Sequence, residues 1–446
     1  MKILQTLEVE MQNSPVEGLS YIAQSLFDDI RALSEGEIGI TRASYGEGES
    51  RLATFLSEFA QANGLEVKTD RAANLHFSLP KNKSNKSSNS NTASIWCGSH
   101  LDSVPQGGNY DGLAGIIAGL LCLIAQKESS QISFYSLNVV ALRGEESAWF
   151  GKAYLGSSAL FGKLNAQDLD LTQAHTGLSL KECMQATGAD IDAILNQECL
   201  IDLSQIHAYL ELHIEQGPVM IKKNIPVAVV SGLRGNVRHS RIRCYGVAGH
   251  SGVVPKELRH DVVFAVANLI MKIDKYWQEL LNQGADLVVT IGIITTDVNE
   301  HAITKIPDKL SFSCDIRSQD DATLNLFHQF IKNECATIAN ESVVNGLLPM
   351  TGIRFEFDRA IKTAPALMSP DVIEHLLKCC TKQGLAAQLM PSGAGHDAAL
   401  FAGAGIPTGM LFIRNQNGSH NPDETLEMDD FMQGVAVLYA ALINFY

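Results

Sequence analysis

Apolar residues along this chain follow two spacings, one typical of helices and one typical of strands. Helical spacing runs through residues 16–33 and 47–63, and Gly64 is placed to cap the second helix. The charge-free run 112–125 is too short to span a bilayer and predicts a buried helix. Shorter apolar runs, typical of strands, occupy residues 65–69, 75–79, 94–98, 136–142 and 209–214. This mixture predicts an α/β sheet.

The middle third of the chain has a different pattern. Residues 238–245 alternate, 261–281 and 323–338 have helical spacing, and 287–294 and 309–316 are typical of strands. This β-α-β-β-α-β-like order predicts a small α+β (ferredoxin-like) domain. Expected strands at 385–389 and 408–413 and a final helix from 429 return to the first pattern. We therefore predict an α/β catalytic domain, residues 1–232 and 359–446, with an inserted domain at 233–358.

Composition excludes several classes of protein. The chain has 446 residues, enough for two domains, and a formal net charge of −15 with no basic block, which disfavours nucleic-acid binding. Glu8 and Glu10 interrupt the apolar N-terminus, so neither a signal peptide nor a membrane span is expected. Nine cysteines without a CxxC pair are typical of reduced thiols. A cytoplasmic location and a polar surface loop at 81–93 are expected.

Polar residues with ligand chemistry stand where apolar strands end. His100 and Asp102 follow the strand near 94–98, and Asp111 closes a glycine-rich loop that opens a helix. Imidazole and carboxylate suit a divalent cation, and Asp102 is placed to accept the other imidazole N–H of His100. The alternative is a solvated loop with a structural histidine. By itself this motif does not decide between the two.

The second group, Glu145 and Glu146, follows the strand at 136–142. Adjacent carboxylates repel each other, so a pair that faces one site needs a cation. One carboxylate could bind metal while the other acts as general base towards a water molecule. Taken alone, an exposed loop pair is the simpler interpretation. The strongly apolar strand before the pair favours a site.

Two further histidines complete the inventory. His213 ends the strand at 209–214, and His420 lies in the polar segment 417–424. A single histidine is more often an ordinary residue, but three histidines and several carboxylates at strand ends indicate a two-metal hydrolytic centre. His396 and Asp397 could support that centre or form a structural turn.

The motifs together resemble the carbamoylase branch of the M20 metallopeptidase-like family over about residues 16–446. They are Gly-Ser-His-Leu-Asp-Ser at 98–103, Gly-Gly-Asn-Tyr-Asp-Gly at 107–112, the glutamates at 145–146, His-Ile-Glu-Gln-Gly-Pro at 213–218, Gly-His-Ser-Gly at 249–252, Asp-Ile-Arg at 315–317, Ser-Gly-Ala-Gly-His-Asp at 392–397 and Gly-Ser-His-Asn-Pro at 418–422. The 213–218 and 392–397 motifs are specific to this branch. The branch includes N-carbamoyl-L-amino-acid hydrolases, β-ureidopropionases and allantoate amidohydrolases.

The resemblance implies a role for each matching residue. His100 and His213 would hold one metal, Glu146 and His420 the other, and Asp111 would bridge them. Glu145 would be the general base. Gln216, His250 and Arg317 would contact substrate, with Arg317 suited to a carboxylate and His250 also stabilising the oxyanion. The inserted domain, which carries His250 and Arg317, would act as a lid and form a homodimer.

Two departures from the family pattern affect the substrate rather than the metals. The family usually follows the paired glutamates with Gly-x-Arg-Phe, whereas this chain has Ser147, Ala148, Trp149 and Phe150. An asparagine that contacts substrate in relatives is Thr304 here. The metal ligands themselves match the family pattern. The resemblance therefore implies two divalent cations, with zinc as the first candidate and manganese, cobalt or nickel as alternatives.

The expected reaction is hydrolysis of a linear amide or ureido C–N bond in a small carboxylated molecule. The first candidate substrate is an N-carbamoyl-L-amino acid, which would yield the amino acid, carbon dioxide and ammonia. The alternatives within enzymes are an allantoate or ureido-acid amidohydrolase and an N-acyl-amino-acid hydrolase or dipeptidase. The alternative outside enzymes is an inactive M20-fold dimer that only binds.

Overall fold

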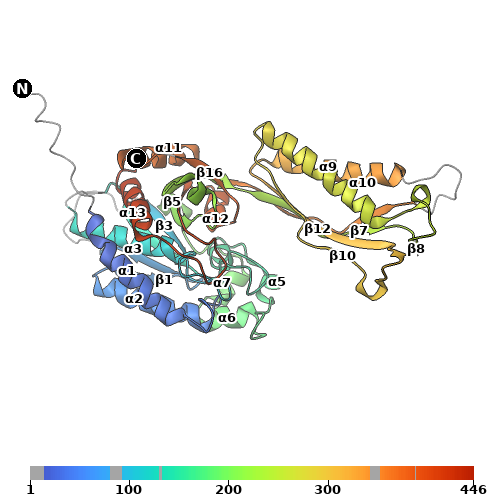
Figure 1. Ribbon diagram of the computed structural model, residues 1–446. Coiled ribbons are helices and arrows are strands. Elements are labelled where there is room, and N and C mark those ends of the chain that lie inside the picture. The colour runs from blue at the N-terminus through green and yellow to red at the C-terminus, as the bar shows by residue number, and fades with distance from the viewer. Residues whose placement is uncertain (1–14, 81–92, 130–132, 342–351, 387, 446) are drawn as a thin grey trace, which may run out of the picture. The chain divides into compact units, whose positions relative to one another are not determined.

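A nine-stranded mixed sheet forms the centre of the larger of two units, which comprises residues 1–231 and 367–446 (Figure 1). The computed structural model describes residues 15–80, 93–129, 133–341, 352–386 and 388–445. The strand order is β1-β2-β4-β3-β5-β17-β6-β15, with β16 paired to β6. The four middle strands, β4, β3, β5 and β17, run parallel, so their carboxyl ends meet at one edge of the sheet.

The strands of this sheet are β1 (Glu66–Thr69), β2 (Leu75–Ser78), β3 (Ser94–His100), β4 (Ser136–Leu142), β5 (Ile206–Ile214), β6 (Val227–Leu233), β15 (Ala366–Leu367), β16 (Leu389–Ser392) and β17 (Thr408–Ile413). The helices of the unit are α1 (Ser20–Ser34), α2 (Glu47–Ala62), α3 (Leu113–Glu128), α4 (Leu155–Leu160), α5 (Ala166–Leu169), α6 (Leu180–Ala186), α7 (Ile191–Leu195), α8 (Val219–Lys223), α11 (Pro370–Lys382), α12 (Ala398–Gly403) and α13 (Met428–Ile443).

Helix α3 explains the charge-free apolar run. All its residues from Leu113 to Ala125 are buried, because the helix packs against strand β3 and helix α13. Helix α1, which has one exposed face, buries only Ala23, Leu26, Phe27 and Ile30, at helical spacing, along with Ser34. This buried helix begins two residues after Asp111.

The smaller unit, residues 232–366, has its own six-stranded sheet and hydrophobic core. Its main strands follow the order β10-β12-β7-β13, with β9 paired to β12 and β14 to β7, and helices α9 and α10 cover one face (Figure 1). This is the expected β-α-β-β-α-β arrangement. The elements are β7 (Gly235–Tyr245), β8 (Gly249–His250), α9 (Val262–Asn282), β9 (Val288–Thr290), β10 (Ile294–Thr296), β11 (Lys305–Ile306), β12 (Lys309–Ser318), α10 (Asp321–Glu341), β13 (Arg354–Phe357) and β14 (Ile361–Thr363).

The structure corrects two predicted boundaries. The predicted strand at 385–389 is wrong, because the Leu385 amide still caps helix α11 by donating to the Cys380 carbonyl, and the strand begins at Leu389. The inserted unit ends at residue 366 rather than 358, since β14 pairs with β7 and belongs to the smaller sheet. Of the predicted loop 81–93, residues 81–92 lie outside the described part of the chain. No helix in the described ranges is long and apolar enough to cross a membrane.

Candidate metal centre

The parallel strands bring the predicted ligands to one edge of the larger sheet. His100 is the last residue of β3, Glu145 and Glu146 follow β4, and His213 lies near the end of β5. Asp111 precedes α3, and His420 lies in the loop after β17. Residues far apart in sequence therefore meet because parallel strands end together.

The first cluster joins His100, His213 and Asp111, all buried. Oδ1 of Asp111 lies 3.1 Å from Nε2 of His213 and 3.5 Å from Nε2 of His100. The two Nε2 atoms lie 3.5 Å apart. Nδ1 of each ring faces a backbone carbonyl, that of Asp102 at 3.0 Å and that of Ile214 at 2.9 Å. Since Nδ1 then carries the proton in both neutral rings, each Nε2 presents a lone pair to the cluster.

The second cluster uses the other oxygen of Asp111. Nε2 of His420 lies 3.3 Å from Oδ2 of Asp111 and 3.3 Å from Oε1 of Glu146. Glu146 is buried, whereas the His420 side chain is about half exposed. Contacts with the two carboxylates raise the pKa of His420 to about 10. One carboxylate, Asp111, thus faces two separate groups of ligand atoms.

The donor set fits divalent cations. Oδ1 of Asp111 is buried and accepts no hydrogen bond, although it lies beside two imidazole nitrogens. Lone pairs that converge in a buried site repel each other unless positive charge lies between them. Imidazole and carboxylate are the usual ligands of zinc and of similar metals. His100 with His213 would hold one cation, Glu146 with His420 the other, and Asp111 both.

Asp102 connects these ligands through its carboxylate. Oδ1 accepts the backbone N–H of Glu145 at 3.0 Å, and Oδ2 accepts that of Glu146 at 3.0 Å and the Ser44 hydroxyl at 2.6 Å. Oδ1 also lies 3.4 Å from Nδ1 of His100. Asp102 therefore fixes both the ring of His100 and the backbone that carries the two glutamates.

Glu145 is buried and belongs to a third group of possible ligands, with His100 and Glu146, but not to the Asp111–Glu146–His420 group. Burial raises the pKa of Glu145 well above its usual value, and the negative charges of Glu146 and Asp397 act in the same direction. A carboxylate with a raised pKa accepts a proton readily near neutral pH. This property suits the predicted base.

A buried ion pair that the sequence did not reveal supports the glutamate segment. Arg143 Nη1 donates to Oε2 of Glu49 at 2.6 Å, and Oε1 of Glu49 accepts the Gly144 N–H at 2.9 Å. Glu49 is fully buried, and burial raises its pKa to about 7. The pair ties helix α2 to the end of β4 immediately before Glu145.

A second group lies behind His213; the sequence had indicated His396 as a possible member but not Glu211. Glu211 accepts the Ser99 hydroxyl at 2.8 Å and the Ala398 N–H at 2.9 Å. His396, whose pKa burial lowers well below its usual value, packs edge-on against the His213 ring with centroids 4.3 Å apart. Glu211 and His213 face the same side of β5 because strand side chains alternate, so the spacing of two residues could have identified Glu211.

A third group of supporting residues surrounds Asp111. Its Oδ2 accepts the Gln216 amide at 2.8 Å and the Ser419 hydroxyl at 2.6 Å. Glu424 accepts the backbone N–H of Asp111 and also contacts Ser419. Gly112 is required here because it adopts a left-handed φ of 68° and a Cβ would lie 2.4 Å from the His100 ring. Gln216, a predicted substrate contact, therefore touches the metal centre itself.

The inserted unit carries the other predicted substrate contacts. His250 on β8 is paired with Lys305 on β11, and the Ser251 N–H donates to the Thr304 carbonyl at 2.8 Å, so His250 and Thr304 are neighbours. The guanidinium of Arg317 donates to Oδ2 of Asp315 at 3.0 and 2.8 Å. That ion pair is the structural alternative to a substrate clamp, and the clamp stays a prediction.

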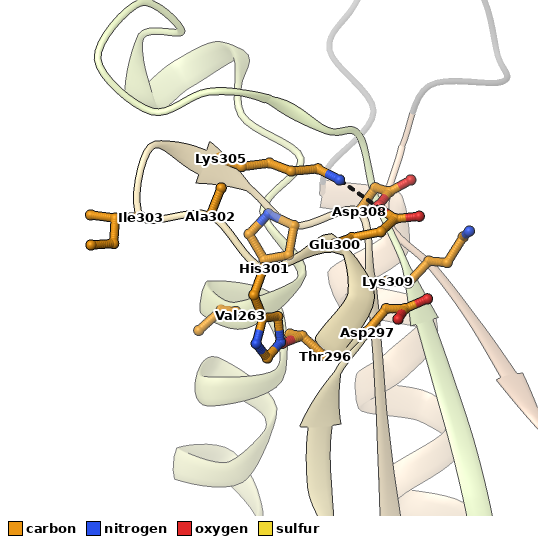
Figure 2. Close-up of a pocket in the computed structure, with 11 residues that line it drawn as sticks. Val263, Thr296, Asp297, Glu300, His301, Ala302, Ile303, Lys305, Asp308 and Lys309 are labelled. Carbon is orange, nitrogen blue, oxygen red and sulfur yellow. Dashed lines mark hydrogen bonds and ion pairs between the residues drawn. The ribbon is translucent and has the colours of Figure 1, made fainter.

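A hollow of about 450 Å³ lies in the inserted unit (Figure 2). It is bordered by Val263 of α9 and by the segment from Thr296 to Lys309, which contains the Lys305–Glu300 ion pair of 2.6 Å. None of the clustered ligands described above lines this hollow, so we assign it no catalytic or metal-binding role.

The chain is similar to a known protein family and to several named amidohydrolases. Residues 96–444 match the model of peptidase family M20/M25/M40. The N-carbamoyl-L-amino-acid amidohydrolase of Pseudomonas sp. (strain NS671) is 30% identical over 407 residues, which cover 91% of this chain and 93% of the relative. The allantoate amidohydrolase of Escherichia coli (strain K12) is 30% identical over 401 residues, covering 90% and 91%.

Solved structures share the fold. A hydantoinase/carbamoylase family amidase from Burkholderia ambifaria superimposes with a TM-score of 0.80 at 24% identity, covering 95% of each chain. A second amidase of this kind, from Burkholderia multivorans, has a TM-score of 0.82 at 22% identity, covering 95% of this chain and 97% of the other. At these identities the likeness establishes the fold alone.

Proposed function

The chain belongs to peptidase family M20/M25/M40, in its carbamoylase branch, and from this premise we propose that it is a two-metal amidohydrolase of small carboxylated molecules. Among its relatives are amidohydrolases of N-carbamoyl-L-amino acids and of allantoate. The main support for the proposal is the position of Asp111. Its two carboxylate oxygens face two different sets of ligand atoms. A bridging carboxylate of this kind is expected at a two-metal site.

Each residue near the clusters has a defined part in the proposed reaction. Bound divalent cations would supply positive charge that polarises the scissile carbonyl and acidifies water. Glu145 accepts the proton of the attacking water and delivers it to the leaving nitrogen, which needs a carboxylate with a raised pKa. Asp102 holds the Glu145 backbone in place through a hydrogen bond of 3.0 Å. The fixed geometry lowers the cost of orienting the base.

We propose an N-carbamoyl-L-amino acid as the substrate. Water then breaks the bond between the carbamoyl carbon and the amino nitrogen, releasing the amino acid and a carbamate that decomposes to carbon dioxide and ammonia. The support is the similarity to carbamoyl-amino-acid amidohydrolases over nine tenths of both chains. Zinc is the proposed metal because the set combines three imidazoles with carboxylates, and manganese, cobalt and nickel accept the same donors.

A substrate panel tests this choice. The metal-loaded protein is incubated with N-carbamoyl-L-amino acids, allantoate, another ureido acid and N-acetyl-L-amino acids, and both ammonia and free amino acid are measured. Equal amounts of amino acid and ammonia from the carbamoyl compounds support the proposal. Faster turnover of allantoate or of acetyl compounds would mean that this compound, and not an N-carbamoyl-L-amino acid, is the substrate. Two bound cations without turnover of any compound would favour a protein that only binds.

We also propose a homodimer through the inserted unit. Helix α9 exposes Phe264 and Met271, which share one helical face, at 71% and 66% of their surface. The edge strand β10 and the residue before it expose Ile294 and Ile293 at 53% and 60%. Exposed apolar side chains on a helix and an edge strand favour self-association. The molar mass in solution, measured by light scattering, tests the proposed dimer. We expect a dimeric wild type and a monomeric Phe264→Glu variant, and a monomeric wild type would contradict the proposal.

A further inference from the structure

Glu424 contacts both loops that carry the ligands of the second proposed cation. Its side chain is 1% exposed. Oε1 accepts the backbone N–H of Tyr110 at 2.8 Å and that of Asp111 at 3.2 Å. Oε2 lies 2.6 Å from the hydroxyl of Ser419, the residue before His420. One buried carboxylate therefore joins the loop of Asp111 to the loop of His420.

Ser419 adds a direct link between these loops. Its hydroxyl lies 2.6 Å from Oδ2 of Asp111, the oxygen that also lies 3.3 Å from Nε2 of His420. His420 itself adopts a left-handed backbone with φ of 60°, an uncommon conformation for a residue with a side chain. The surrounding contacts must hold such a conformation in place, and Ser419 with Glu424 supplies contacts at the adjacent residue.

The packing around Glu424 leaves it no freedom to move away. A Cβ at Gly108 would lie 2.2 Å from both Cδ and Oε1 of Glu424, so the glycine-rich loop closes directly over the carboxylate. Close approach of a backbone to a neighbouring group is a specific reason for glycine. The loop before Asp111 and the side chain of Glu424 thus fit together as one unit.

The first cluster has other supports. His100 and His213 lie on the central strands β3 and β5, and their Nδ1 atoms face the carbonyls of Asp102 and Ile214. None of these contacts involves Glu424 or Ser419. Loss of Glu424 should therefore disturb the two clusters unequally.

We propose that Glu424, acting with Ser419, is a positioning residue for the second cation site. It fixes Asp111 relative to His420, so that both ligands can bind the same cation. The inference rests on the proposed two-cation site and adds a residue to it. Residues that orient metal ligands from behind typically change metal affinity about 10–100-fold when they are removed. Here the loss falls on one of two sites.

The experiment titrates Mn²⁺ into metal-stripped protein and fits the affinity of each site by calorimetry. Glu424→Ala removes both links, and Ser419→Ala removes only the hydroxyl, which keeps the test available if the buried substitution does not fold. Asp423→Asn is the matched control, because this neighbouring acid is exposed. In both test variants we expect the second site to be weakened at least about tenfold, and by more than the first site, with turnover restored by excess Mn²⁺.

Each other outcome contradicts a defined part of the account. Wild-type affinity at both sites in folded Glu424→Ala and Ser419→Ala would overturn the positioning role. Equal weakening of both sites, with a lowered melting temperature and no rescue by Mn²⁺, would assign Glu424 to the general stability of the fold. A wild-type protein that binds fewer than two cations would contradict the proposed function itself, and this inference with it.

Discussion

Oδ1 of Asp111 lies 3.1 Å from Nε2 of His213 and, although buried, accepts no hydrogen bond. The second oxygen of the same carboxylate faces His420 at 3.3 Å. Buried acceptors normally find a donor, so the arrangement is explained by a cation between acceptor and lone pair. This relationship makes Asp111 the centre of the proposed site.

Asp111→Ala should be the most damaging substitution of a single ligand. A bridging carboxylate neutralises two cations at once, so its loss should leave at most one weakly held metal per chain. Elemental analysis after dialysis measures the content. Two tightly bound metals in a folded Asp111→Ala protein would show that the carboxylate does not bridge.

Glu145 and Glu146 should separate proton transfer from metal binding. Glu145→Gln keeps the shape of the side chain but cannot accept a proton, so turnover should fall by about 10²–10⁴ while metal content stays near that of the wild type. Glu146→Gln should lower metal content as well as rate. Metal content per chain and kcat are measured for both variants. Equal metal content in the two variants would refute the division of roles.

Arg317 is paired with Asp315 in the structure, and this pair sharpens the test of the predicted carboxylate clamp. If Arg317 binds substrate, Arg317→Ala should raise KM for carboxylated substrates and spare a carboxamide analogue. The loss of a charge-assisted hydrogen bond is worth about 1.5–3 kcal/mol, roughly tenfold or more in kcat/KM. Asp315→Asn is the matched control. Equal losses for acid and amide, with a lower melting temperature, would make the arginine structural.

His328 should make the inserted unit sensitive to acid. Its Nε2 lies 2.9 Å from Nε2 of the buried His239, whose Nδ1 faces Asp358 at 2.8 Å. Burial, with the nearby charge of Lys332, lowers the pKa of His328 from 6.5 to about 4. Between these values the unfolded chain binds more protons than the folded one, so the free energy of unfolding falls as pH drops from about 6.5 towards 4. Urea unfolding at pH 7 and pH 5 should show a smaller difference in His328→Gln. An unchanged difference would exclude His328 as the cause.

The fold was largely accessible from the sequence, because its main elements are long and periodic. Helices α3 and α9 and strands β4 and β17 were all predicted from apolar spacing. The short helices α4 to α7 were not, since runs of four to seven residues are too short to show a period. The end of the inserted unit was misplaced because β14 is exposed along its length and is defined by pairing with β7.

The ligand set could be proposed from motifs at strand ends, and the structure brings His100, Asp111, Glu146, His213 and His420 together. Asp102 was predicted as a supporting residue, but Glu424 and Glu49 could not be assigned in this way. Glu424 meets the Asp111 loop across more than 300 positions of sequence, and Glu49 meets Arg143 across 94. Such contacts depend on tertiary packing and leave no local pattern in the sequence.

The most direct test of the two-metal amidohydrolase is turnover of an N-carbamoyl-L-amino acid as a function of the cations bound per chain. Metal-stripped protein is reloaded stepwise with Zn²⁺ or Mn²⁺, and ammonia release is measured at each step alongside elemental analysis. A two-metal amidohydrolase should show no turnover without metal and full turnover only as occupancy approaches two cations per chain. Turnover of the carbamoyl compound by protein shown to be metal-free, or full turnover that needs no second cation, would contradict it.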